Sequence, residues 1–204
     1  MGKPIASLSS GWPRLDDLPP LPPGLEEVRR RLKDDSRDGE PDDTFVRLSC
    51  MQALTAAAEG NHGVGAVVVH DGRVVAMGRN RAFHPRVRSD LHAEMDALNA
   101  LERDHPGLPA VECTLYSSLE CCPMCTTRLI NVGIGRVLYA ADDDECGMIR
   151  RFDALPAGYR DLAASRTPPQ RFGRAACSAA LAAAAADIFR INLETLNQRV
   201  LRRE

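Results

Sequence analysis

Residues 91–94 read Leu-His-Ala-Glu, and residues 120–125 read Glu-Cys-Cys-Pro-Met-Cys. These two segments supply one imidazole (His92), two thiolates (Cys122 and Cys125) and one carboxylate (Glu94). Zinc binds nitrogen and sulfur ligands of this kind tetrahedrally, and a catalytic zinc site keeps its fourth position for water. Three protein ligands with an acid beside one of them therefore predict a hydrolytic zinc site.

Both segments are predicted to begin helices. Apolar residues recur at three- and four-residue steps over 92–101, and residues 123–132 are also predicted as a helix with Pro123 in its first turn. A helix N-terminus presents free N–H groups and a partial positive charge, which stabilise thiolates and an oxyanion. We expect Glu94 to carry a proton from water to a departing amine, so that a ring amine and water give a ring oxo group and ammonia.

Outward from these segments, strands are predicted to alternate with helices. Two β-branched runs flank Asp71-Gly72, which predicts a hairpin. An amphipathic helix is predicted after Asp42 or Asp43, either of which could cap it. The alternation predicts an α/β fold, a three-layer α/β/α domain around a mixed sheet, with these strands: 64–69, 74–77, 111–116 and 136–140.

The two ends of the chain are predicted to be additions to this domain. Residues 13–23 hold five prolines and are predicted as an extended arm, because proline is excluded from helix interiors and central strands. Residues 24–33 are predicted as a short helix and 177–203 as one long Ala-rich helix. The expected organisation has three parts: a Pro-rich N-terminal extension (1–41), a zinc-dependent deaminase domain (42–165) and a C-terminal helical extension (166–204).

Composition is that of a globular protein with one chemically unusual spot. The formal net charge is -2 and the pI is about 6.2, so the chain as a whole does not attract nucleic acid. No apolar run approaches the roughly 20 residues of a membrane-spanning helix, and residues 1–11 do not resemble a secretory signal. Seven cysteines, three of them crowded at 121–125, suit thiolate chemistry in a reducing compartment. We therefore expect a cytoplasmic protein without a membrane partner.

The motif pair resembles the zinc signature of the cytidine deaminase superfamily, which the sequence matches from about 44 to 141. The likeness rests on His-Ala-Glu at 92–94 and Cys-Pro-Met-Cys at 122–125. Its flanks agree as well: Gly-Ala-Val-Val-Val at 65–69, Gly-Arg-Asn at 78–80 and Tyr-Ser-Ser at 116–118. The pattern is similar to that of the bacterial guanine deaminase, fungal cytosine deaminase and tRNA adenosine deaminase branch.

This resemblance implies a five-stranded sheet between helices and a homodimer or larger assembly. It also implies Zn²⁺ as the cofactor, with Glu94 as the catalytic residue. Substrate would be contacted by the side chain of Asn80 and by the backbone N–H groups of Ala93 and Cys122. Asn80 could instead be a turn residue that leaves a strand, a place that asparagine favours.

One departure from the family pattern concerns the residue before the first ligand cysteine, which is normally proline and is Cys121 here. The two-residue gap favours Cys122 and Cys125 as the ligands and leaves Cys121 as a packed neighbour. Two other readings stay open. The zinc site could be closed and structural, with a fourth ligand from Cys113, Cys146 or His84, or the chain could be a non-catalytic member that keeps its zinc.

Two substrate classes compete. The acidic run at 142–145 and the net charge favour a neutral heterocycle, namely a nucleobase, a nucleoside or a related ring. Arginines of the 79–88 segment and of the C-terminus could instead grip the phosphates of a tRNA loop, which makes a tRNA-specific adenosine deaminase the alternative.

Several other side chains receive simpler predictions. Phe83 and His84 could stack on a substrate ring. The remaining histidines (62, 70 and 105) lie beside predicted turns and are expected to be solvated. The cysteines outside the motif are expected to behave as small apolar side chains, and they are Cys50, Cys113, Cys146 and Cys177.

Overall fold

The predicted hairpin is one edge of a five-stranded mixed sheet in the computed structural model, which describes residues 15–18, 20–34, 39–191 and 193–202. The strands are β1 (Gly65–His70), β2 (Arg73–Arg79), β3 (Thr114–Leu119), β4 (Arg136–Ala141) and β5 (Arg171–Arg174). Their order across the sheet is β2-β1-β3-β4-β5. β1 runs antiparallel to β2 and to β3, whereas β3, β4 and β5 are parallel.

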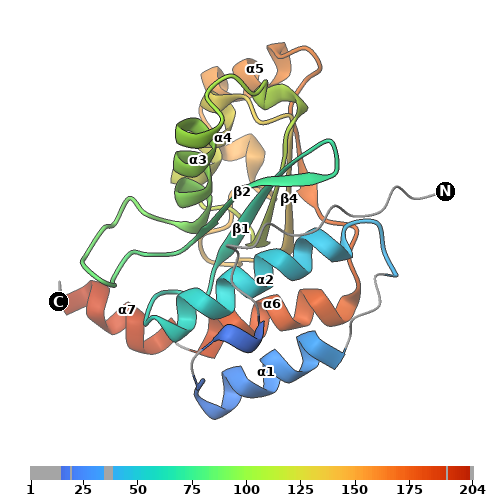
Figure 1. The fold of residues 1–204 in the computed structure, drawn as a ribbon. Coiled ribbons are helices and arrows are strands. Elements are labelled where there is room, and N and C mark those ends of the chain that lie inside the picture. The colour runs from blue at the N-terminus through green and yellow to red at the C-terminus, as the bar shows by residue number, and fades with distance from the viewer. Residues whose placement is uncertain (1–14, 19, 35–38, 192, 203–204) are drawn as a thin grey trace.

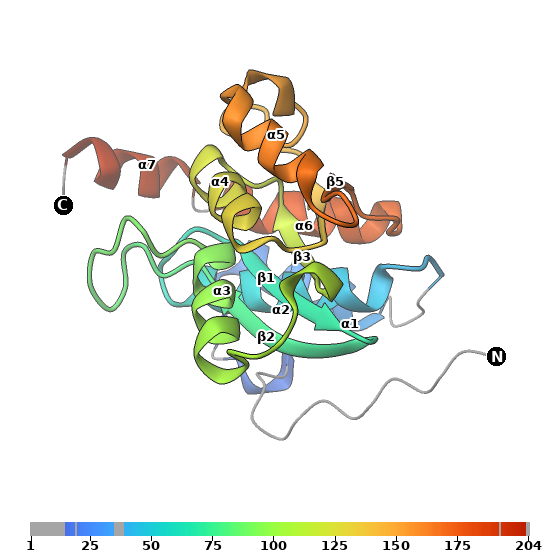
Figure 2. The same ribbon diagram turned by 90° about the horizontal axis from the view of Figure 1, so that it is seen from above.

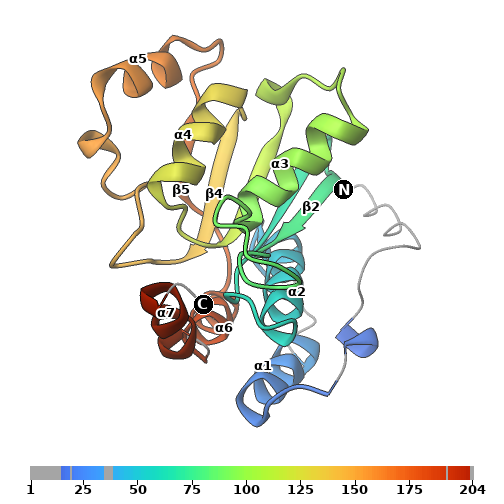
Figure 3. The same cartoon turned by 90° about the vertical axis from the view of Figure 1, so that its left-hand side faces the viewer.

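Helices cover both faces of this sheet (Figure 1). The helices are α1 (Pro23–Asp34), α2 (Asp43–Ala58), α3 (Ala93–Asp104), α4 (Pro123–Val132), α5 (Ala157–Ser165), α6 (Ala179–Ile191) and α7 (Leu193–Arg202). α3 packs on β1 and β2 on one face, and α4 lies on that side together with α5 (Figure 3). α2 and α6 cover the other face, and α1 packs on the outside of α6 (Figures 1 and 2). The predicted three-layer α/β/α fold with a mixed five-stranded sheet is confirmed.

Close contact between α3 and β2 depends on a glycine. A Cβ atom added to Gly78 would lie 2.2 Å from the backbone nitrogen of Ala97, which is far inside van der Waals contact. Any side chain at this position would push α3 off the sheet. The motif helix α3 is therefore seated directly on the strand that ends beside Asn80.

The core joins the ends of the chain to the central domain. Leu25 and Val28 of α1 and Leu181 and Ile188 of α6 are buried in the same apolar cluster as the strands. The segment predicted as a C-terminal extension also supplies β5, which pairs with β4. Its four residues begin two positions after the Pro-Pro pair and show no alternating apolar pattern, so the sequence predicts no strand there.

Three element predictions differ from the structure. The third strand begins at Thr114 and not at 111, because residues 110–112 form a 3-10 turn. The single helix over 177–203 is instead α6 and α7, since α6 packs on the sheet and α7 packs Leu196 against Phe83. Within the predicted extended arm, residues 15–17 form a 3-10 helix. Residues 13, 14, 19, 192 and 203 of these predicted segments lie outside the described part of the chain.

Asp42 occupies the N-cap position of α2 but makes no capping hydrogen bond with its side chain. Its carboxylate instead accepts from the Tyr116 hydroxyl (2.8 Å) and from the Ala176 N–H (2.7 Å). Asp43 is 1% exposed and accepts from the backbone N–H groups of Ser178, Glu40 and Gly39 at 2.7–3.0 Å. The expected cap is therefore a clamp that ties the start of α2 to β3 and to the segment before α6.

Asp43→Asn is expected to reduce stability at pH 7 by about 1–3 kcal/mol, because hydrogen bonds to a charged group are lost. Burial acts to raise the pKa of Asp43, but the backbone donors, Ser178 first, hold it below its ordinary value of 3.8. A lowered pKa stabilises the fold above the unfolded pKa, and this contribution is lost as the pH falls through the folded pKa. Urea unfolding should therefore show the gap between the two proteins closing below about pH 4. Asp161→Asn, on the exposed side of α5, is the control.

Among the described residues, no helix is both long and apolar enough to span a membrane.

Candidate active site

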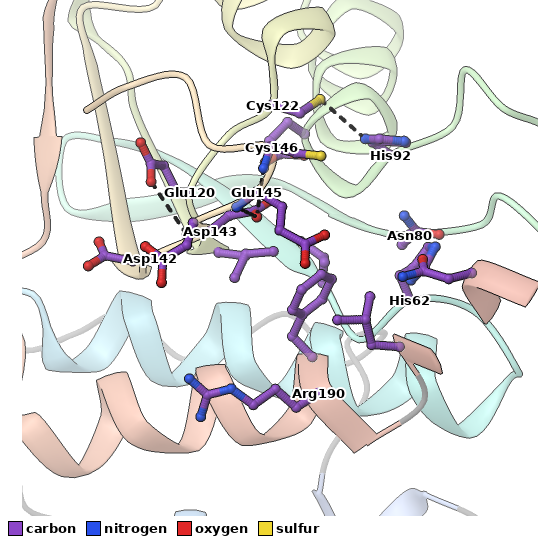
Figure 4. A pocket seen from close by; sticks show the side chains of 17 residues that line it. His62, Asn80, His92, Glu120, Cys122, Asp142, Asp143, Glu145, Cys146 and Arg190 are labelled. Atoms are coloured by element: carbon purple, nitrogen blue, oxygen red, sulfur yellow. Dashed lines mark hydrogen bonds between the residues drawn. The ribbon is translucent and has the colours of Figure 1, made fainter. Parts of the chain in front are cut away.

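The two motif segments meet because each begins a helix at the same edge of the sheet. His92 is the N-cap of α3 and Cys122 is the N-cap of α4, with Pro123 at the first helical position. Cys125 lies one turn into α4 and is fully buried. Nδ1 of His92 is 3.6 Å from Sγ of Cys122 (Figure 4). The same nitrogen is 3.7 Å from Sγ of Cys125. The two motifs, separate in the sequence, thus place His92, Cys122 and Cys125 in one cluster.

This cluster fits a zinc ion. Zinc–sulfur bonds of about 2.3 Å and zinc–nitrogen bonds of about 2.0 Å, at tetrahedral angles, place sulfur and nitrogen about 3.5 Å apart. The two distances to His92 are close to that value. Among the described residues, this group of ligand atoms within 4.8 Å of one another has three members, His92, Cys122 and Cys125. Three ligands leave the fourth position of a tetrahedral ion open.

The thiols are already arranged to favour one thiolate. A hydrogen bond from Cys125, aided by His92, lowers the pKa of Cys122 to about 4. The same hydrogen bond and then burial raise the pKa of Cys125 well above its ordinary value. The hydrogen bond to Cys122 raises the pKa of His92. Zinc ligands bind in their deprotonated forms, so Cys122 is prepared for the metal and Cys125 must lose its proton when the metal enters.

Glu94 lies two residues into α3 and is 3% exposed. One carboxylate oxygen, Oε1, accepts a hydrogen bond from the Ser117 hydroxyl at 3.1 Å. Ser117 belongs to β3 and is itself fully buried, so the carboxylate is held from behind by the sheet. Glu94 also lines the cavity described next, which leaves it able to exchange a proton with a molecule bound there.

A cavity of about 350 Å³ opens beside the cluster (Figure 4). Four parts of the chain enclose it: the motif helices, the strand ends around Val64 and Asn80, the acidic loop 142–146, and the C-terminal helices α6 and α7. Phe189 and Arg190 come from α6, and Leu193 and Asn197 come from α7. The C-terminal helices therefore form one wall of the site. No local sequence pattern predicted that these helices would reach the cavity.

Two of the three residues predicted to contact substrate, Asn80 and Cys122, line this cavity. Asn80 is 3% exposed and lines it. Its Oδ1 accepts the N–H of Ala82 at 3.0 Å, so Asn80 is a turn residue and a cavity residue at once, with its Nδ2 left as the donor. Ala93 begins α3 and Cys122 caps α4, where backbone N–H groups have no partner inside the helix.

A family model described as the cytidine and deoxycytidylate deaminase zinc-binding region matches residues 40–141, half of the chain. The chain belongs to this deaminase family. Within it, the chain is 34% identical over 121 residues to a tRNA-specific adenosine deaminase of Agrobacterium fabrum, covering 55% of this chain and 75% of that protein. It is 32% identical over 124 residues to a guanine deaminase of Bacillus subtilis, covering 58% and 71%.

One relative in this family is much longer than this chain. The chain is 30% identical over 123 residues to the chloroplastic tRNA(adenine(34)) deaminase of Arabidopsis thaliana, which is 60% of this chain but only 9% of that protein. The shared part is thus a domain in a larger protein.

Solved structures agree with the family fold. One comes from work on A-to-I editing by tRNA:A34 deaminases at the wobble position of transfer RNA. It has a TM-score of 0.58 and 25% identity, and the match covers 71% of this chain and 98% of that chain. A guanine deaminase from Nitrosomonas europaea has a TM-score of 0.55 and 22% identity, covering 83% and 93%. The second likeness concerns the fold alone.

The departure from the family motif, Cys121, is a packed thiol. It is fully buried, and its backbone oxygen accepts the Met148 N–H at 2.9 Å. Burial, followed by the charge of Glu94, raises the pKa of Cys121 well above its ordinary value. Of the suggested fourth ligands, Cys146 lines the cavity and is exposed, Cys113 bonds the Pro109 carbonyl and His84 lies on the surface. Cys146, expected to behave as a small apolar side chain, is thus exposed at the cavity.

One further expectation about the loop after β2 differs from the structure. Phe83 is 9% exposed and packs against His62 and Leu196, so it does not face the cavity. Three of the four arginines of the 79–88 segment are ion-paired: Arg79 with Glu59 (2.7 Å), Arg81 with Asp96 (3.2 Å) and Arg88 with Asp90 (2.7 Å).

Glu120 was missed as a site residue, although it directly precedes the cysteines. Its side chain is fully buried and accepts the backbone N–H of Arg150 (2.6 Å) and that residue's Nε–H (2.8 Å). Gly147 lies so close that a Cβ atom there would be 2.2 Å from Oε2 of Glu120. The carboxylate therefore fastens the 142–150 loop, which carries the acidic wall of the cavity, to the segment that holds the zinc ligands.

Glu120→Gln is expected to loosen this loop. A charge-assisted hydrogen bond worth about 1.5–3 kcal/mol is weakened, which should raise the population of the open loop about 10- to 100-fold. Limited trypsin digestion at Arg150 and Arg151 measures this directly. Asp144→Asn is the matched control, because Asp144 also bonds Arg150 but its side chain is 88% exposed and contributes little. Equal cleavage rates for the two variants would contradict the fastening role.

Proposed function

We propose that this chain is a hydrolytic deaminase that uses Zn²⁺ to remove the exocyclic amine of a small heterocycle and release ammonia. The substrate is a nucleobase, a nucleoside or a related ring. The observation that carries the proposal is the placement of Glu94 on the same cavity as a three-residue zinc cluster. A closed structural site would have four protein ligands and no use for a buried acid.

Each residue of the cluster receives a role. His92, Cys122 and Cys125 hold the metal. Zinc bound there supplies Lewis-acid chemistry, which makes water a nucleophile at neutral pH. Glu94 accepts one proton of the attacking water and delivers it to the ring nitrogen. It then takes the remaining proton from the hydroxyl group on the ring carbon and delivers it to the amine, which leaves as ammonia while that carbon becomes an oxo group. Ser117 holds the carboxylate in place through its hydrogen bond to Oε1.

The remaining contacts orient the ring. Nδ2 of Asn80 donates to an acceptor of the substrate, since Oδ1 is used by Ala82. The backbone N–H groups of Ala93 and Cys122, at helix N-termini, stabilise negative charge that develops on oxygen during the attack. Because Asn80 follows directly on β2 while Ala93 and Cys122 lie at helix N-termini, these groups need little reorganisation during the reaction.

A small substrate is favoured over tRNA by the shape and charge of the site. The volume of about 350 Å³ is at the low end of the roughly 300–1,000 Å³ that small-molecule pockets occupy. α6 and α7 form one wall and the acidic loop forms another, and carboxylates there repel phosphates. The arginines of the 79–88 segment are largely committed to ion pairs.

The test is ammonia release by the zinc-loaded protein. The panel contains guanine, adenine, cytosine, pterins, their nucleosides and nucleotides where these exist, and tRNA. Ammonia from one small ring supports the proposal. Ammonia from tRNA alone would replace it with the tRNA-specific adenosine deaminase. Zinc bound without ammonia from any compound would favour a non-catalytic family member.

We further propose a homodimer that works in the cytoplasm. Large apolar side chains exposed on one chain supply the support for self-association, and they are Val87, Ile191, Val200 and Leu201. A reducing compartment suits free thiolate ligands. Light scattering measures the oligomer directly, and a monomer at micromolar concentration would contradict the first part.

A further inference from the structure

His62, expected to be solvated, lies in the wall of the cavity. Two backbone hydrogen bonds connect His62 to Asn80 through Val64. The Val64 N–H donates to the His62 carbonyl at 2.7 Å, and the Asn80 N–H donates to the Val64 carbonyl at 3.0 Å. His62 and Asn80 are therefore brought to the same end of the cavity. Figure 4 shows them on the side away from Asp142 and Asp143.

Aromatic packing holds the imidazole of His62 in place. The ring of Phe83 meets it edge-on with centroids 5.4 Å apart, and the ring of Phe189 lies 6.1 Å away. Arg199 of α7 stacks on the outer face of this arrangement, 4.8 Å from the centroid of Phe83. The orientation of His62 is thus set by Phe83 and Phe189, and Phe83 is itself packed by Arg199.

The two ring nitrogens of His62 have different surroundings. Nδ1 is buried and has no hydrogen-bond partner, and among the described residues none hydrogen-bonds to either ring nitrogen. Nε2 is not among the buried unpartnered atoms, so it is accessible, and His62 is one of the residues that line the cavity. An imidazole with no protein partner at either nitrogen is unusual for a half-buried histidine.

The protonation state follows from these surroundings. Burial, and then the neighbouring His92, lowers the pKa of His62 to about 4, so the ring is neutral at pH 7. A proton on Nδ1 would be a buried N–H without an acceptor, which is rare in proteins. The proton therefore belongs on Nε2, where it faces the cavity as a hydrogen-bond donor.

We propose that His62 is a specificity-determining residue that donates a hydrogen bond from Nε2 to a ring nitrogen or carbonyl oxygen of the substrate. The proposal rests on the proposed function, in which a heterocycle occupies this cavity. Together, His62 and Asn80 present two neutral donors from one wall, while the opposite wall is acidic. The site therefore selects rings with acceptors on one edge and donors on the other.

The test uses the full-length, zinc-loaded chain with histidine labelled by ¹⁵N, and three rings that have no amine to lose: xanthine, hypoxanthine and uracil. The free protein should show His62 as the neutral tautomer protonated on Nε2. A ring that binds should shift the Nε2 signal of His62 and leave that of exposed His105 unchanged. An Nδ1-protonated tautomer, or no shift with any of the three rings, would overturn the proposal.

Binding to variants separates hydrogen bonding from packing. His62→Phe keeps an aromatic ring but removes the donor, and should raise the Kd of the bound ring about 10- to 100-fold. His62→Gln retains an N–H donor and should recover part of this loss, while His105→Gln should change nothing. Equal Kd values for His62→Phe and the unaltered protein would refute the role.

The proposal and the proposed function fail in different ways. Rings that bind through His62 without any deamination of amine-bearing rings would refute the function and keep the role of His62. Ammonia release by His62→Phe with unaltered KM would keep the function and refute the role of His62.

Discussion

Replacing Glu94 with glutamine is expected to lower kcat for ammonia release by about 10²- to 10⁴-fold, the usual contribution of a positioned general acid–base group. Glutamine has nearly the same shape, and its oxygen can still accept the Ser117 hydroxyl. Its amide cannot take a proton from water or return one to the amine. The proton transfer is therefore lost while the packing is kept.

The measurements are initial rates with the substrate found in the panel, zinc content by atomic absorption, and thermal unfolding. Zinc content and Tm should match those of the unaltered protein. Glu102→Gln is the matched control, because Glu102 lies on the same helix but is exposed and pairs with Arg128. A Glu94→Gln protein that retains more than about a tenth of the activity would rule out proton transfer by this residue.

The zinc cluster could be predicted because it is built from local rules. His92 and Cys122 each start a helix, and the two-residue gap between Cys122 and Cys125 places both sulfurs on the first turn of α4. The alternation of strands and helices then brings the two helix starts to one edge of the sheet. The zinc cluster therefore does not depend on a contact between distant segments whose sequences show no pattern.

The cavity walls could not be predicted in the same way. Asn197 reaches the site because α6 packs on the sheet and α7 follows it, an arrangement set by tertiary packing. Glu120 lines the cavity and holds the 142–150 loop because its carboxylate accepts a hydrogen bond from Arg150, thirty positions later in the sequence. Both contacts join segments whose own sequences show only a helix or a polar loop.

His62 shows the same limit for a single side chain. Turn residues beside it, Gly60 and Asn61, favoured a solvated histidine. Burial came from Phe83 and Phe189, which lie 21 and 127 positions away along the chain. Whether a polar residue in a turn is exposed to solvent or buried depends on which elements pack over it. The local sequence pattern does not contain that information.

Replacing Cys125 with serine is expected to weaken zinc binding by well over 100-fold, since even changes outside the ligand shell cost about 10- to 100-fold. Serine is smaller and a poor zinc ligand at neutral pH, and the lost sulfur is one of three. Deaminase activity should fall with the zinc. A chelator should lower the Tm of the unaltered protein but leave that of Cys125→Ser nearly unchanged, because a ligand that binds only the folded state stabilises it.

Cys146→Ser is the control that decides between an open and a closed site. Cys146 lines the same cavity but is absent from the three-residue cluster. An open site therefore predicts that Cys146→Ser keeps its zinc, its Tm and its activity. If Cys146 were the fourth ligand of a closed site, its loss would weaken zinc binding nearly as much as the loss of Cys125, and no position would remain for water. Zinc affinity measured by competition with a chromogenic chelator distinguishes the two outcomes, and it does so without any knowledge of the substrate.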